Sequence, residues 1–161
     1  LIEAFLILAR EGDTGLPDED FPVEDVVRQE MEKVRPLISG KAVELRLEQE
    51  ARPELHAPSR VFSVLFGNLL RNACNYTDQG LVTVTIRRNS VVISDTGIGM
   101  SAEELSRVFE PFFRAGDRQK EGQGIGLSIV RRLSERYGWP VRLESEPGRG
   151  TTATISFPSV A

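Results

Sequence analysis

The sequence predicts an α/β protein, built as a two-layer α/β sandwich with a mixed sheet of about five strands and three helices on one face. Long segments with apolar residues at helical spacing occur among shorter segments in which apolar and polar residues strictly alternate. The chain of 161 residues suits one domain that buries its own core.

The first part of the chain contains two predicted helices and two predicted strands. Residues 1–10 are apolar and typical of the end of a helix, which glycines and a proline then interrupt. Residues 23–38 carry apolar side chains at helical spacing, and Gly40 is well placed to terminate that helix. Residues 43–48 alternate strictly, as a half-buried strand does, and a short strand follows near Leu55.

The central part predicts a helix followed by a hairpin. Residues 59–76 form an amphipathic helix, and residues 77–80 form a turn after it. Two segments rich in β-branched residues, 81–87 and 91–95, then predict a hairpin around Asn89.

The last part predicts two helices and the closing strands. Residues 101–104 match a capping box at the start of a short helix. Residues 114–123 are polar, contain glycine and lack periodicity, so we expect a mobile loop there. Residues 125–137 return to helical spacing, and residues 141–144 and 151–157 alternate as strands do.

Composition and charge exclude several classes of function. The net charge of −4 and the pI near 5.2 argue against broad binding of nucleic acid. A single cysteine excludes an internal disulfide framework and suits a reducing compartment. No apolar run approaches the ~20 residues that cross a bilayer, and we expect no signal peptide. Because the chain begins within an apolar pattern, we expect it to be part of a longer protein.

The strand of residues 91–95 ends in a candidate binding motif. Asp95 follows the β-branched run, and Gly97 and Gly99 come directly after it. Glycine tolerates positive φ and brings no Cβ, so the backbone here can approach a ligand closely. A carboxylate at the mouth of the strand can accept a hydrogen bond from an amino group. Taken alone, these residues could also form an ordinary turn.

Two further patterns point to a phosphate ligand. Asn68, Asn72, Asn75 and Tyr76 form a polar stripe along one helix edge, and a carboxamide oxygen is a suitable ligand for Mg²⁺. A solvated helix edge explains any one of these asparagines equally well. Glycines in residues 122–126 open the next long helix, whose free amides bind phosphate. A charged loop precedes them instead of a strand, which argues against a dinucleotide fingerprint, and no Gly-Lys-Ser/Thr element of a P-loop exists.

Five stretches in this order closely resemble the asparagine box, the first glycine box, the phenylalanine box, and the second and third glycine boxes of sensor histidine kinases. The resemblance is to their catalytic ATP-binding domain, whose superfamily includes gyrase, MutL and the large heat-shock chaperone. It extends from about Phe21 to Pro158. The five stretches are residues 68–77, 91–100, 109–114, 122–127 and 148–152.

The resemblance implies a role for each candidate residue, with ATP and Mg²⁺ as cofactors. Asn72 would be the metal ligand, and Asn68 would lie beside it in the phosphate site. Asp95 would accept from the adenine amino group with support from Thr151, and Arg114 is the strongest loop candidate for a phosphate contact. Tyr76 could pack on the purine or simply be a core aromatic at a helix end. The remaining implied nucleotide contacts are Asn75, Gly97, Gly99, Gly122, Gly124, Gly126 and Leu127.

The sequence departs from the family pattern at two positions. Asn75 stands where the family often has a basic residue, so one phosphate contact is expected to be absent or made by Arg114. ATP-hydrolysing relatives carry a glutamate four residues before the metal-binding asparagine, where this chain has Asn68, which cannot take a proton. This favours transfer to an external acceptor over hydrolysis, because phosphoryl transfer relies mostly on positioning and charge neutralisation. His56 lacks the sequence context of a phosphoacceptor and is expected to be structural or exposed.

The resemblance therefore implies the ATP-binding half of a histidine kinase. Residues 1–15 would be the end of a preceding dimerisation and phosphoacceptor helix with its linker, and residues 16–161 the catalytic domain. The phosphate would pass to a histidine on a separate helical domain and then to a response regulator. We expect a monomeric, cytoplasmic fragment of a homodimeric parent, which contacts a membrane only through other parts, and no nucleic-acid partner. A stand-alone serine kinase and a non-catalytic nucleotide-sensing module stay open as alternatives.

Overall fold

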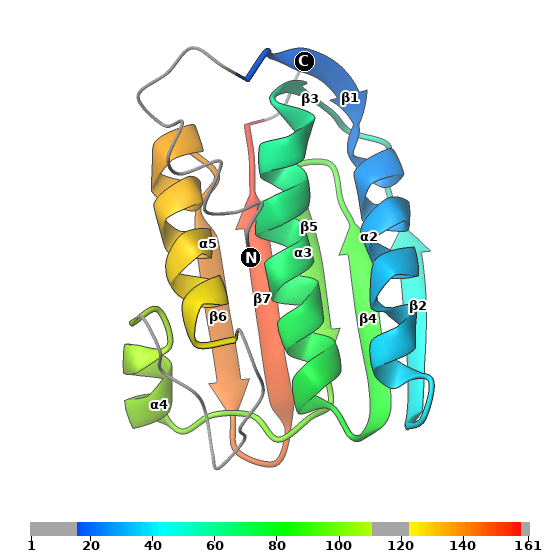
Figure 1. Cartoon of the computed structure of the whole chain (residues 1–161), viewed down its shortest axis with the longest axis vertical. Helices are drawn as coiled ribbons and strands as arrows, with labels where there is room; N and C mark the ends of the chain where they lie inside the picture. Colours follow the sequence, from blue (N-terminus) through cyan, green and yellow to red (C-terminus); the bar gives the residue numbers. More distant parts are fainter. Residues whose placement is uncertain (1–15, 111–122, 159–161) are drawn as a thin grey trace.

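The computed structural model describes residues 16–110 and 123–158. Within these residues five strands form one mixed sheet in the order β2-β4-β5-β7-β6; β2 runs parallel to β4, and the other neighbours are antiparallel. Three long helices cover one face of this sheet (Figure 1), which confirms the predicted two-layer α/β sandwich. The sheet strands are β2 (Ala42–Gln49), β4 (Gln79–Ile86), β5 (Ser90–Asp95), β6 (Val141–Glu146) and β7 (Gly150–Ser156).

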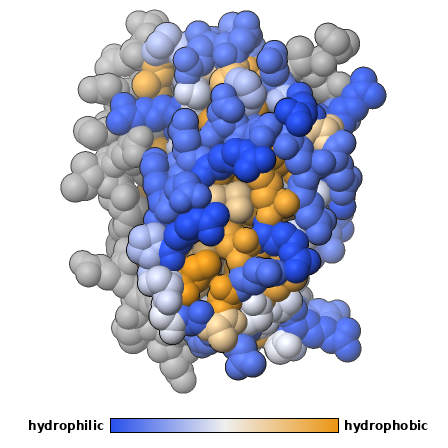
Figure 2. All heavy atoms as spheres, turned by 90° about the vertical axis from the view of Figure 1, so that its right-hand side faces the viewer, coloured by the Kyte–Doolittle hydropathy of each residue, from blue (hydrophilic) through white to orange (hydrophobic). Residues whose placement is uncertain are grey.

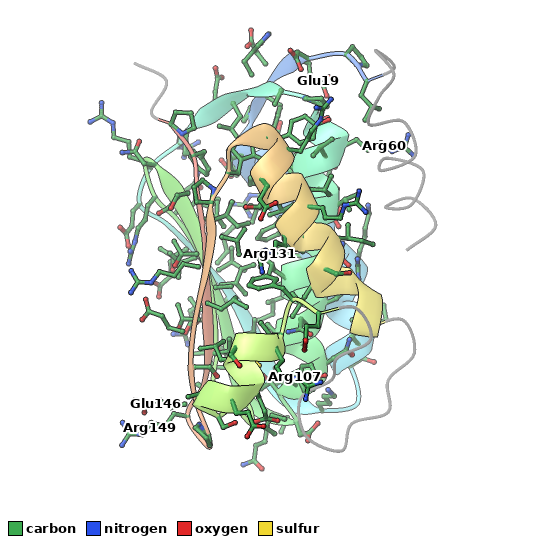
Figure 3. The ribbon with its side chains drawn as sticks, turned by 90° about the vertical axis from the view of Figure 1, so that its left-hand side faces the viewer. Glu19, Arg60, Arg107, Arg131, Glu146 and Arg149 are labelled. Atoms are coloured by element: carbon green, nitrogen blue, oxygen red, sulfur yellow. The ribbon has the colours of Figure 1, made fainter. Side chains whose placement is uncertain are left out.

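The three covering helices are α2 (Val23–Ile38), α3 (Ser59–Tyr76) and α5 (Gln123–Tyr137). Each has an apolar stripe at helical spacing that turns toward the sheet. A fourth helix, α4 (Ala102–Arg107), is short and begins with the predicted capping box, in which both hydrogen bonds are formed. In the side view of Figure 3 the side chains between sheet and helices form one continuous layer.

The two faces of the sheet differ in polarity, as the alternation of its strands requires. Toward the helices, Ile93 pairs in register with Val84 and Ala153. On the open face, Ser94 pairs with Thr83 and Thr152. The edge strand β2 leaves half-buried apolar side chains beside α2, and Figure 2 shows apolar surface between hydrophilic rims along this edge.

The core centres on the fully buried ring of Phe62 in α3. Trp139 meets this ring edge-on with 5.4 Å between the centroids, and Phe66 stacks on it at 6.3 Å. Phe21 in β1 and Phe157, which follows β7, also contact this ring, with 6.0 and 6.3 Å between the centroids. Aromatic contacts of this kind contribute beyond the area that they bury, so this cluster ties the helical layer to the sheet.

Several boundaries differ from the prediction. A second, two-stranded antiparallel sheet joins β1 (Glu19–Pro22) to β3 (Glu54–Ala57); β1 was not predicted, because only Phe21 of its residues is buried. Helix α5 begins two residues earlier than expected, and so does β4. Helix α2 does end at Ile38, but Gly40 is not among the glycines with positive φ. The predicted helix of residues 1–10 and nearly all of the loop 114–123 lie outside the described residues.

Candidate functional site

A pocket lies between α3 and the sheet, close to where α3 and β5 end and β7 begins. Its polar lining consists of three residues predicted from the sequence, Asn72, Asp95 and Thr151. The rest of its lining is apolar and comes from α3, three strands and the loop after β5. These apolar residues are Leu69, Ala73, Ile93, Met100, Leu143 and Ala153.

Asp95 is the buried carboxylate of this pocket, with 7% of its surface exposed. Its Oδ1 accepts from the backbone N–H of Gly97 at 2.9 Å and of Thr151 at 3.2 Å. Burial raises the pKa of this carboxyl above its usual value, while these two backbone bonds and the nearby Thr77 hydroxyl act to lower it. Asp95 is thus oriented by the backbone of the loop after β5 and of strand β7, and it lines the pocket.

Thr77 adds a buried hydroxyl beside Asp95. Its Oγ1 is buried and makes no hydrogen bond of ordinary geometry to any described residue. A buried polar atom without a partner is uncommon in proteins and often marks the place of a water or a ligand. This hydroxyl lies beside Asp95 but does not line the pocket.

The loop after β5 is held by contacts of its own backbone. Ile98 N–H donates to the Tyr76 carbonyl at 3.2 Å, and Gly148 N–H donates to the Ile98 carbonyl at 2.7 Å. A Cβ at Gly97 would overlap the Tyr76 carbonyl oxygen, and one at Gly99 would overlap that of Glu146. The close approach that the glycines allow is thus, in this structure, an approach to the neighbouring backbone.

Ser145 links the loop after β5 to the start of β7, and it was not among the residues predicted from the sequence. Its Oγ accepts from Met100 N–H at 2.7 Å, donates to the Gly150 carbonyl at 3.0 Å and lies 2.8 Å from Thr151 Oγ1. A single serine in a strand gives no motif signal. Its place on the face of Leu143, two residues earlier in β6, would have been the only indication.

Only one residue of the predicted polar stripe on α3 lines the pocket. Asn72 lines the pocket, and within the described part of the chain its carboxamide has no hydrogen-bond partner. Asn68 is buried away from the pocket lining, where its Nδ2 donates to the Val64 carbonyl at 2.7 Å and its Oδ1 accepts from Arg71 at 3.1 Å. Asn75 and Tyr76 are half-buried on the last turn of α3 and are also outside the lining.

The second glycine-rich stretch reaches the same end of the molecule as the pocket. Gly124 and Gly126 lie in the first turn of α5, whose start is at the lower end of Figure 1, near the ends of α3 and β5. Leu127, in contrast, is buried in the core. Figure 3 places Arg107 of α4 at this end together with Glu146 and Arg149 of the β6–β7 turn. Gly122 and Arg114 lie outside the described residues.

The apolar lining could have been found in part from the sequence. Ile93 lies two residues before Asp95 and Ala153 two residues after Thr151, so strand alternation places each pair on one face. Leu69 and Ala73 are four residues apart in the predicted amphipathic helix 59–76, so helical spacing places them on one face. Met100 and Leu143 gave no signal, because a loop residue and an edge-strand residue reach the pocket only through the three-dimensional fold.

His56, which was expected to be structural or exposed, and the single cysteine both lie outside the pocket lining. His56 is exposed and contacts Asp20 through Nδ1 at 2.8 Å, and Cys74 is buried. Among the described residues no group of three or more His, Cys, Asp or Glu could hold a metal. None of the helices in this part of the chain is long and apolar enough to cross a membrane.

Comparison with known proteins agrees with the fold. The family described as Histidine kinase-, DNA gyrase B-, and HSP90-like ATPase matches residues 58–161. A sensor-like histidine kinase of Rhizobium meliloti (strain 1021) is 38% identical over 116 residues, which are 67% of this chain and 22% of that protein. SenX3 of Mycobacterium tuberculosis (strain H37Rv), also a sensor-like histidine kinase, is 29% identical over 159 residues, 93% of this chain and 39% of its own. The solved structure of full-length ShkA in complex with AMPPNP is 27% identical, with a TM-score of 0.77 over 99% of this chain and 36% of that one.

The fold and the family match therefore define an α/β domain of the ATPase class. The chain belongs to the histidine kinase-, DNA gyrase B- and HSP90-like ATPase family, and its matched relatives are sensor histidine kinases. The predicted family is confirmed. The chain spans well under half the length of these two relatives.

Proposed function

We propose that this chain binds Mg·ATP and transfers its γ-phosphate to a histidine on a separate helical domain, for relay to a response regulator. The observation that carries the proposal is Asp95, a buried carboxylate at the end of an otherwise largely apolar pocket. The apolar walls suit the faces of a purine, and the carboxylate suits its exocyclic amino group. A site built around such a pair rejects a base that lacks the donor, since the buried carboxylate would stay unpaired.

The phosphates and the metal would lie toward the start of α5. Asn72 is the residue that we assign to Mg²⁺, because its carboxamide oxygen is on the pocket wall and is not engaged by the described residues. Such an oxygen fits this ion, which is usually held by one or two protein groups together with phosphates and waters. The free amides and the dipole of α5 favour the phosphate oxygens. Gly122, Gly124, Gly126 and Arg114 keep the phosphate roles that the sequence predicts.

The amide side chain at position 68 supports transfer over hydrolysis. Asn68 occupies the position of the hydrolytic glutamate, and its carboxamide is engaged with Val64 and Arg71. Neither an amide nor the helix backbone can deprotonate water here. A histidine acceptor is itself nucleophilic, so the domain would need to supply only positioning and charge neutralisation.

The names of the relatives support a histidine as the acceptor. The two curated relatives are named as sensor-like histidine kinases, and ShkA was solved with AMPPNP, an ATP analogue. By analogy we place the phosphoacceptor helical domain in the same parent protein and the response regulator downstream. Residues 1–15 would then end the helix that precedes residues 16–161, and the parent would act as a homodimer.

Phosphotransfer in trans tests this proposal. The chain would be incubated with Mg²⁺, γ-labelled ATP and the separately produced helical domain of its parent. We expect label on that domain that is labile to acid and stable to alkali, as phosphohistidine is. Asn72→Ala should abolish the transfer, and Asn89→Ala, a matched change in the β4–β5 loop, should not. Acid-stable label on serine would favour the serine-kinase alternative, and no label with intact ATP binding would favour a non-catalytic sensor.

A further inference from the structure

We propose that Ser145 is a positioning residue that fixes the direction of the Thr151 hydroxyl and so makes the pocket select a 6-amino purine over a 6-oxo purine. This inference rests on the proposed function, because it assigns a specificity role within the same nucleotide site. Ser145 and Thr151 lie directly opposite each other on β6 and β7, with 2.8 Å between their hydroxyl oxygens.

The hydrogen bonds of Ser145 decide which hydroxyl is the donor. A serine hydroxyl has one hydrogen and two lone pairs. The Gly150 carbonyl, 3.0 Å away, can only accept, so the Ser145 hydrogen goes to it. Met100 N–H, at 2.7 Å, occupies one lone pair. The remaining contact is therefore a donation from Thr151 to Ser145.

This direction determines what Thr151 offers to a ligand. With its hydrogen committed to Ser145, the Thr151 hydroxyl presents only lone pairs to the pocket that it lines. Asp95, the other polar group at this end, also accepts when ionised. The polar wall formed by Asp95 and Thr151 is therefore made of acceptors. An exocyclic amino group satisfies it, whereas a 6-oxo group would face acceptors with another acceptor.

The contacts of Ser145 also explain why its role is more than packing. Met100 lines the pocket and begins the segment before α4, while Gly150 and Thr151 open β7. A structural clamp alone would affect every nucleotide equally. A residue that sets the direction of one hydroxyl affects the ratio between two bases that differ in the group facing that hydroxyl.

Calorimetric titration with ATP and with inosine triphosphate separates these two effects. In the wild type we expect ATP to bind the more tightly. In Ser145→Ala the Thr151 hydroxyl is free to rotate and donate to the 6-oxo group. The ratio of the Kd for inosine triphosphate to the Kd for ATP should therefore fall by about tenfold or more, and tenfold corresponds to ~1.4 kcal/mol. Ser145→Thr, which keeps the hydroxyl, should retain the wild-type ratio.

Ser94→Ala is the matched control. Ser94 and Thr152 form a similar cross-strand hydroxyl pair, at 3.3 Å, on β5 and β7, and Thr152 is the residue next to Thr151. Neither residue lines the pocket, so this variant should keep the affinity for both nucleotides.

A fall in affinity of Ser145→Ala by the same factor for both nucleotides would overturn the specificity role and leave the proposed function intact. If Ser145→Ala fails to fold, Thr151→Val removes the lone pairs directly, and an unchanged ATP preference in that variant would equally overturn the inference. Wild-type protein that binds neither nucleotide would overturn the proposed function itself.

Discussion

At the scale of single residues, the most consequential feature is the balance between the burial of the Asp95 carboxylate and its hydrogen bonds. In the proposed function Asp95 accepts while ionised, but burial disfavours the charge, and two backbone N–H groups and the nearby Thr77 hydroxyl offset only part of that cost. Residues that serve a ligand at the expense of the free fold are common at functional sites. Asp95 has the properties of such a residue.

This balance predicts that Asp95→Asn folds at least as stably as the wild type at pH 7 without nucleotide. The folded-state pKa of Asp95 is raised, so its contribution to stability is present at low pH and is lost as the pH rises through that value. A neutral asparagine can keep both backbone bonds without the cost of a buried charge. Thermal melts of both proteins at pH 7 would measure this, with exposed Glu48→Gln as the control. A clearly lower Tm for Asp95→Asn would contradict it.

Cys74 gives a second prediction at this scale. Burial in α3 raises the pKa of its thiol to about 11 from a usual value of 9.0. Because the thiolate is the reactive form, labelling by a thiol reagent at pH 8 should be slower in the folded protein than in denaturant by about a hundredfold or more. The same shift predicts that stability falls between pH 9.0 and about 11, where only the unfolded thiol ionises. Equal labelling rates in the two states would refute the burial of Cys74.

Single residues also show the limit of sequence reasoning. Asn68 and Asn72 belong to one stripe in the sequence, yet only Asn72 lines the pocket, because a hydrogen bond turns the Asn68 side chain back to its own helix. Spacing predicts which residues share a helix face, but it does not predict which side-chain hydrogen bond forms. Asp95 and Thr151 were predictable from their motifs, whereas Ser145 was not.

At the scale of elements, the turn between β6 and β7 is the part of the fold that most constrains the site. Gly148 and Gly150 both have positive φ, at +77° and +100°. A Cβ at Gly150 would overlap the Asp95 carbonyl oxygen, but one at Gly148 would meet nothing within 4 Å. The turn is therefore held against β5 at Gly150 and open at Gly148.

Alanine substitutions should separate these two glycines. Gly148→Ala should cost only the strain of a left-handed residue, about 1–2 kcal/mol of unfolding free energy. Gly150→Ala adds the overlap with Asp95, so it should cost more and should also weaken ATP binding. Denaturant unfolding and calorimetry of the two variants would measure both effects. Equal losses of stability and affinity in the two variants would show that neither stability nor ATP binding depends on the close approach of β7 to Asp95.

Most of these elements were predictable because their signals are local. The bounds of α3 and the capping box of α4 follow from periodicity and from end residues. Strand β1 was not predictable, since it is short and polar and forms only by pairing with β3, more than 30 residues later. The parallel pairing of β2 with β4 likewise joins strands that β3 and α3 separate in the sequence, so no single segment encodes it.

At the scale of the whole molecule, the described residues share one hydrophobic core. Trp139, the only tryptophan of the sequence, contacts Phe62 of α3 and Tyr137 of α5 within that core. A single core predicts cooperative unfolding. Denaturation followed by tryptophan fluorescence and by far-ultraviolet circular dichroism should therefore give coincident transitions. Two separated transitions would show that the helical layer and the sheet unfold independently.

The central claim is that this molecule holds ATP through Asp95. Calorimetric titration of the chain with Mg·ATP, beside Asp95→Asn, tests it most directly. In the variant, Oδ1 would stay with Gly97 and Thr151, and the amide nitrogen would face the adenine amino group, so two donors would oppose each other. We predict saturable binding by the wild type and its loss in a variant that is still folded. Binding of equal affinity by both proteins would contradict the account.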